Sequence, residues 1–101
     1  MSTSVTRPRS ETKTTTERPK VYKVIILNDD YTPRDFVVTV LRAVFRMTTD
    51  QAAGVMLTAH MRGSCVVAVY TREVAETKAT QAVDMGASEG YPLMFTTEPE
   101  D

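Results

Sequence analysis

The apolar residues of this chain begin abruptly near residue 20, and that boundary limits where a core can form. Residues 1–20 contain two apolar residues, Met1 and Val5, whereas residues 21–101 contain forty. A segment so poor in apolar side chains cannot bury enough surface to offset the entropy of ordering its backbone. We therefore expect a flexible, threonine-rich extension at 1–20 and one small folded domain at 21–101, without a large internal cavity.

The net charge changes sign at the same boundary. The extension carries five basic and two acidic residues, a net charge of +3, and the remainder carries seven basic and eleven acidic residues, a net charge of −4. A nucleic-acid-binding surface needs a denser basic patch with aromatic residues between the charges. We therefore expect no nucleic-acid partner.

The counts of metal-binding and apolar residues exclude several further classes of protein. One Cys and one His are too few for an internal disulfide or a cysteine-rich zinc cluster, so we expect no metal, no cofactor and a cytoplasmic protein. No stretch approaches the roughly 18 apolar residues of a membrane span, and the N-terminus lacks the apolar segment of a signal peptide. The sequence therefore predicts no membrane partner and no export.

Hydrophobic patterning predicts a β-α-α-β-α-β order. Apolar runs at 21–27, 65–70 and 91–97 indicate three strands, and residues 98–101 are acidic and expected to fray. Three strands and three amphipathic helices in such a short chain fit a small two-layer α+β domain, with the helices packed on one face of the sheet. The first two strands are apolar almost throughout, a pattern compatible with a partner or the extension covering the other face, and the sequence alone leaves this open.

Capping residues and apolar stripes place the helices. Thr32 is the expected N-cap of the first helix with Pro33 in its first turn, and Thr48 or Thr49 begins the second, which ends at a left-handed Gly63. Thr71 caps the third, and Gly86 and Gly90 bracket its end. The expected buried faces are Phe36, Val37, Val40, Leu41, Val44 and Phe45 on the first helix, and Val74, Ala75, Ala79, Ala82 and Val83 on the third.

The residues that could carry catalysis form no specific motif. The candidates are Cys65, His60 and the pair Asp29-Asp30, and Cys65 lies in an apolar run where it is most simply a small buried side chain. The sequence therefore predicts that the protein is not an enzyme. The polar cluster Asn28-Asp29-Asp30 after a buried strand is, on pattern alone, most simply a turn.

Four motifs in the right order resemble the ClpS family, the bacterial N-end-rule adaptors. They are Tyr22-Lys23-Val24 through Pro33 with Phe36-Val37, then Met56-Leu57 with Ala59-His60, then Thr71 to Lys78, and finally Pro92-Leu93. Together they span residues 21–97 without gaps. The resemblance implies an adaptor that captures proteins beginning with Phe, Tyr, Trp or Leu and delivers them to the AAA+ unfoldase ClpA for degradation by ClpP.

The same resemblance assigns the site. Asn28, Asp30 and His60 would hold the free α-amino group, with Asp29 beside them ordering the loop or meeting the peptide backbone. An ammonium group has only donors, so a site of acceptors satisfies it, and protonation of His60 should weaken binding. The first side chain would enter an apolar pocket lined by Ile26, Leu27, Thr32, Val37, Met56 and Leu93.

Arg34 departs from the family pattern, because many members have a methionine gating the pocket at this position. We expect its guanidinium to stack over aromatic first residues and to favour them over leucine. The alternative is a solvated arginine that points away from the pocket.

The resemblance also implies a docking surface for the unfoldase. The residues at the matching positions are Glu73 and Lys78, with Tyr31 and Thr32 as neighbours. The resemblance also implies that the extension contacts the unfoldase while substrate is transferred to it. No symmetric patch argues for a dimer, so the expected state is a monomer.

Three other functions remain open on sequence alone. One is an interaction module without an amine site, a second is a nucleic-acid-binding domain that uses the extension, and the last is a hydrolase that uses Cys65. The adaptor requires Asn28, Asp30 and His60 to converge on one cleft, whereas the others do not.

Overall fold

The computed structural model describes residues 19–100, so the expected extension lies almost entirely outside the described residues. The elements follow in the predicted order: β2 (Val21–Leu27), α1 (Arg34–Phe45), α2 (Thr49–Arg62), β3 (Ser64–Thr71), α3 (Arg72–Ser88) and β4 (Met94–Pro99). The predicted small α+β domain with three helices and a three-stranded sheet is confirmed. Within the described residues, no helix combines the length and apolar character needed to cross a membrane.

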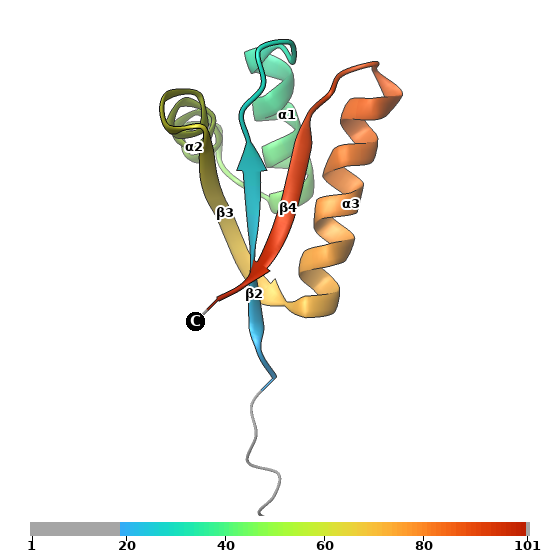
Figure 1. Ribbon diagram of the computed structural model, residues 1–101. Coiled ribbons are helices and arrows are strands. Elements are labelled where there is room, and N and C mark those ends of the chain that lie inside the picture. The colour runs from blue at the N-terminus through green and yellow to red at the C-terminus, as the bar shows by residue number, and fades with distance from the viewer. Residues whose placement is uncertain (1–18, 101) are drawn as a thin grey trace, which may run out of the picture.

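The central strand is β2, which pairs antiparallel with both of the others in the order β3-β2-β4. In Figure 1, α1 lies behind the strands, α2 lies beside β3 and α3 lies beside β4. The core forms between the sheet and this helical layer, and Ile26, Leu41, Val24 and Val40 are its largest fully buried side chains. Helix α1 therefore occupies the middle of the helical layer.

Aromatic packing joins α1 to the sheet. The Phe45 ring stacks on Tyr70 of β3 and Phe95 of β4, with centroid separations of 6.5 and 5.6 Å. Lys78 of α3 lies 5.7 Å from the Tyr70 ring centroid, and its Nζ donates to the Val44 carbonyl oxygen at 3.0 Å. That carbonyl belongs to the last turn of α1, where no intrahelical donor remains, so Lys78 stabilises the end of the helix.

Helix α3 packs through small residues. Its buried stripe is Ala75, Ala79, Ala82 and Gly86, which lets its backbone approach the sheet closely. The prediction that Val74 lies on this face is wrong, because it precedes the stripe by one position and is 42% exposed.

The capping predictions are confirmed for α2 and corrected for α1. Thr48 Oγ1 accepts from Gln51 N and Gln51 Oε1 accepts from Thr48 N, and Gly63 ends the helix with a φ of 94°. Thr32 is not the N-cap of α1. Pro33 holds that position, and its ring has no acceptor with which to cap the helix. The Thr32 hydroxyl is donated to Asp29 Oδ2.

The C-terminal strand begins and ends later than the sequence predicts. Gly90, with a φ of 82°, turns the chain after α3, and the ladder with β2 begins only at Met94. The expected fraying at Glu98 and Glu100 is wrong, because the start of β2 supplies their partners. Lys23 Nζ lies 3.8 Å from Glu98 Oε1, and the Glu100 N–H donates to Val21 O at 2.9 Å.

One face of the sheet has no helix over it. Cross-strand partners share a face, so Ile25 lies with Val66, and Leu27 lies with Met94. Ile25 is 8% exposed, whereas Leu27, Val66, Val69 and Met94 are between 36% and 48% exposed. The apolar far face predicted from sequence is thus present, and no described residue covers it.

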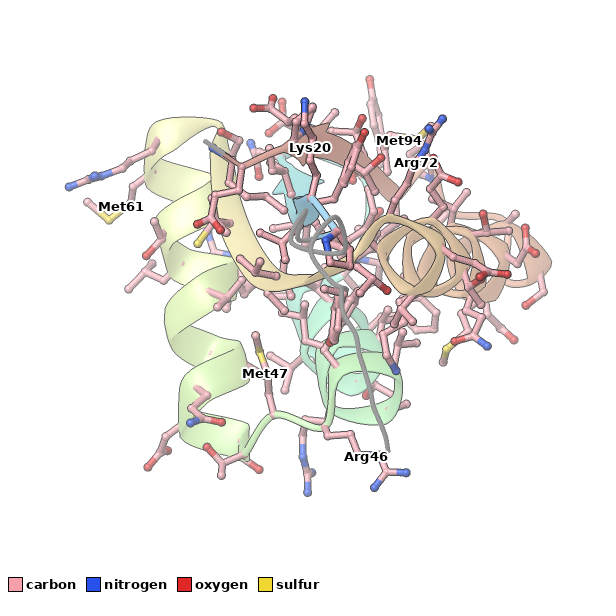
Figure 2. All side chains as sticks on the ribbon, turned by 90° about the horizontal axis from the view of Figure 1, so that it is seen from below. Lys20, Arg46, Met47, Met61, Arg72 and Met94 are labelled. Atoms are coloured by element: carbon pink, nitrogen blue, oxygen red, sulfur yellow. The ribbon has the colours of Figure 1, made fainter. Side chains whose placement is uncertain are left out.

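Arg46 ends α1 in the left-handed conformation, with φ 59° and ψ 32°. Figure 2 shows its side chain pointing outward, while Met47 points inward between α1 and α2. Left-handed backbone costs a residue with a Cβ about 1–2 kcal/mol relative to glycine. This strain arises from the Cβ atom of Arg46, so it does not depend on the charge of the guanidinium group.

Arg46→Gly should therefore raise the free energy of unfolding by about 0.5–1 kcal/mol, after allowing for the greater freedom of glycine in the unfolded chain. Urea denaturation followed by circular dichroism measures this change. Arg46→Ala is the control, because it removes the charge but keeps the Cβ. Equal stabilisation by both substitutions would contradict the assignment of strain to the backbone.

Candidate functional site

The loop between β2 and α1 is organised by one carboxylate. Asp29 Oδ1 accepts from the backbone N–H groups of Tyr31 and Thr32 at 2.8 and 2.7 Å, and Oδ2 accepts from Thr32 Oγ1 at 2.9 Å. The Asn28 N–H donates to Gly63 O at 2.9 Å, which ties the loop to the end of α2. Both Asp29 oxygens are thus engaged within the loop, and its expected role in ordering the loop has a structural basis.

Helix α2 brings a second set of side chains to this loop. Met56, Ala59 and His60 follow one another at i, i+3 and i+4, so they share one side of the helix. Together with the loop, α1 and the Leu93 segment they enclose a cavity of about 150 Å³. Its lining residues are Ile26, Leu27, Asn28, Asp29, Asp30, Thr32, Arg34, Val37, Met56, Ala59, His60 and Leu93.

Every residue predicted for the amine site and the pocket lines this one cavity. Ala59 was missed, although its position three residues after Met56 and next to His60 carried the signal. Tyr31 is 80% exposed and does not line the cavity. Glu73 and Lys78 lie on α3 and are not part of the lining either.

The cavity has an apolar floor and a polar rim. Ile26, Val37 and Leu93 are buried, whereas Asn28, Asp30 and His60 are exposed. A cavity of roughly 150 Å³ takes a benzene-sized group, whereas sites for drug-sized ligands start at roughly 300 Å³. The cavity is therefore suited to a ligand that places one apolar side chain on the floor and a hydrogen-bond donor, attached next to that side chain, at the rim. Among residues 19–100, no three His, Cys, Asp or Glu side chains gather as a metal site would need.

Arg34 points toward the rim rather than away from it. Its Nη2 lies 3.1 Å from His60 Nε2. A guanidinium has no acceptor, so the hydrogen bond between these two atoms requires a lone pair on His60 Nε2. The interpretation of Arg34 as a solvated arginine that points away is therefore wrong.

Cys65 lies outside the cavity, in a hollow between α2 and β3. Burial raises the pKa of its thiol, and the nearby Arg62 charge offsets this only in part. A raised pKa leaves less of the nucleophilic thiolate at neutral pH. This environment does not favour the hydrolase that the sequence left open.

The fold and the cavity define a small α+β binding domain with a site sized for one side chain. Residues 17–96 match the family described as ATP-dependent Clp protease adaptor protein ClpS, and the chain belongs to that family. The ClpS resemblance predicted from sequence is thereby confirmed.

Similar proteins share nearly the whole chain. It is 64% identical to ATP-dependent Clp protease adapter protein ClpS 1 of Bradyrhizobium diazoefficiens over 101 residues, all of both chains. It is also 64% identical over 96 residues to ClpS 2 of Mesorhizobium japonicum, covering 95% of each. The solved structure of Agrobacterium tumefaciens ClpS2 bound to L-phenylalaninamide superposes with a TM-score of 0.81 at 64% identity, covering 82% of this chain and all of that one.

Replacing Asp29 should loosen the loop that forms the rim. Asp29→Ala leaves two backbone donors and one hydroxyl without their partner, so we expect the free energy of unfolding to fall by about 1–2 kcal/mol. Asp29→Asn keeps one carbonyl oxygen for the backbone donors and should lose less. Urea denaturation of both variants measures the difference, and equal losses would contradict the role of the Oδ1 contacts.

Proposed function

We propose that this protein binds polypeptides by a free N-terminal amino group and a large hydrophobic first side chain, Phe, Tyr, Trp or Leu. It then delivers them to the AAA+ unfoldase ClpA for degradation by ClpP, in the cytoplasm and as a monomer. The observation that carries the proposal is the cavity of about 150 Å³ with acceptors at its rim. The relative solved with L-phenylalaninamide supports it, because that ligand combines a free amine with an aromatic side chain.

The rim provides the chemistry that an ammonium group needs. Asn28 offers an amide oxygen, Asp30 a carboxylate and His60 a ring nitrogen, and all three line the same cavity. Charge-assisted hydrogen bonds to a carboxylate are stronger than neutral ones.

The floor provides the hydrophobic part of the affinity. Burying a Leu or Phe side chain is worth about 1.5–3 kcal/mol, which is too little alone for stable capture. The amine contacts and the side-chain cavity must therefore act together. Met56 in the wall can adapt to rings of different shape.

We assign delivery to the exposed surface of α3. Glu73 is exposed and available to a partner, whereas Lys78 is half-buried and bonded to Val44 O. In this proposal Glu73 and Lys78 both contribute to the docking surface, and the exposure of Glu73 supports a direct contact, while Lys78 also holds the end of α1. Tyr31, 80% exposed on the neighbouring loop, adds an aromatic contact.

Peptide binding tests the proposal directly. Fluorescent peptides that begin with Phe, Leu, Tyr or Trp and have a free amine should bind, and the same peptides with an acetylated amine or a first Ala should not. Fluorescence anisotropy measures the affinities. Asp30→Asn should weaken binding of the free-amine peptides at least 10-fold, because a charged hydrogen bond contributes about 1.5–3 kcal/mol.

Asp84→Asn is the matched control, since Asp84 is an exposed acidic residue of α3 that does not line the cavity. It should leave the affinities unchanged. Equal binding of free and acetylated peptides would leave the chain as an interaction module with no amine site.

Arg34 is the natural competitor of the amine. Both groups only donate, and Arg34 already occupies the His60 Nε2 lone pair at 3.1 Å. Arg34→Met should therefore raise the affinity of all free-amine peptides by roughly 5-fold, equivalent to one hydrogen bond of about 1 kcal/mol. Anisotropy titrations of Phe and Leu peptides against both proteins measure this.

The ratio of Phe to Leu affinities tests the stacking hypothesis separately. If the guanidinium also stacks over aromatic first residues, Arg34→Met should lower that ratio even as both affinities rise. A fall in both affinities would contradict the competitor role, and an unchanged ratio would contradict stacking.

A further inference from the structure

Gly86 lies in the last turn of α3, directly behind one wall of the cavity. It is buried but does not line the cavity, whereas Leu93 does and is 2% exposed. A Cβ atom placed on Gly86 would lie 2.9 Å from Leu93 Cβ and 3.6 Å from Leu93 Cδ2. Leu93 therefore lies between this glycine and the cavity.

The close approach cannot be relieved by rotating a side chain. Non-bonded carbon atoms pack at roughly 3.5–4.0 Å, and the backbone fixes the position of the Leu93 Cβ. The Tyr91 N–H donates to Gly86 O at 2.8 Å, and the Tyr91 ring packs on Phe36 of α1 with a centroid separation of 4.9 Å. These contacts tether Tyr91 to two helices. The clash of a side chain at position 86 therefore falls on Leu93, which would have to move away from α3.

We propose that Gly86 sets the depth of the cavity and so determines the size of first side chain that the protein selects, favouring aromatic rings over leucine. The inference rests on the proposed function and specifies its substrate class. The absence of a Cβ lets Leu93 withdraw toward α3 and leaves room for a ring. Restoring ordinary contact would move the Leu93 Cβ by roughly 0.6–1.1 Å, and in a cavity of about 150 Å³ such a shift of one wall removes space that only the larger side chains use.

Gly86→Ala tests the proposal with peptides that begin with Trp, Phe or Leu and have a free amine. We expect the affinities for Trp and Phe peptides to fall about 10-fold relative to Leu, because one methylene changes discrimination in a pocket by roughly 10-fold or more. Gly54→Ala is the matched control. Gly54 is the other glycine inside a helix, and a Cβ there meets nothing within 4 Å, so the ratios should not change.

A loss of stability alone would not produce this change in ratio. Circular dichroism and urea denaturation establish that Gly86→Ala is folded, and an unchanged ratio in the folded variant would overturn the proposal. If Gly86→Ala does not fold, Leu93→Val can be used instead, because the shorter valine side chain deepens the cavity at the wall that Leu93 forms. It should raise the preference for Trp over Leu, and an unchanged preference would overturn the proposal equally.

The wild-type titrations separate the two proposals. If the wild-type protein binds no free-amine peptide, both the proposed function and the role of Gly86 are overturned. If it binds and the variants keep its ratios, the adaptor function stands and only the role of Gly86 is overturned.

Discussion

The pairing of β2 with both other strands is the constraint on which the rest of the structure depends. Because β2 is central, its residues Val24 and Ile26 are covered by neighbours on either side and form the middle of the core. Its last residues, Ile26 and Leu27, also enter the cavity, and the chain leaves the sheet directly into Asn28 and Asp29. A rigid strand therefore fixes the position of a loop that would otherwise be free to move.

The loop that forms the rim of the cavity is held in place by hydrogen bonds, and exposed polar side chains lie next to these bonds. Asp29 uses both oxygens to fix the loop, while the exposed Asn28 and Asp30 line the cavity on either side of it in the chain. Under the proposed function, a loop fixed in this way holds the acceptors in place before a ligand binds, which would lower the entropy lost on binding. Under the proposed function Arg34 acts in the opposite direction, because its contact with His60 would have to be broken for an amine to bind there.

Much of the fold and of the site follows from local signals in the sequence. The capping box at Thr48 and the left-handed Gly63 were predicted, because caps depend on a few adjacent residues. The later start of β4 and the order at Glu98 were not, because they depend on the length of β2 as a pairing partner. The assignment of Thr32 as the N-cap of α1 was wrong, because its hydroxyl is donated to Asp29 and the folded loop places Pro33 at the cap position.

The sequence by itself determined the order of the elements, because hydrophobic periodicity is a local property of the chain, and its motif residues carried the resemblance from which most of the cavity lining was predicted. Tertiary structure alone decided the direction of Arg34, the placement of Ala59 in the cavity and the contact between Gly86 and Leu93. These features depend on distances between segments far apart in the chain. Such distances are set by how closely the helices approach the sheet, and no local pattern encodes them.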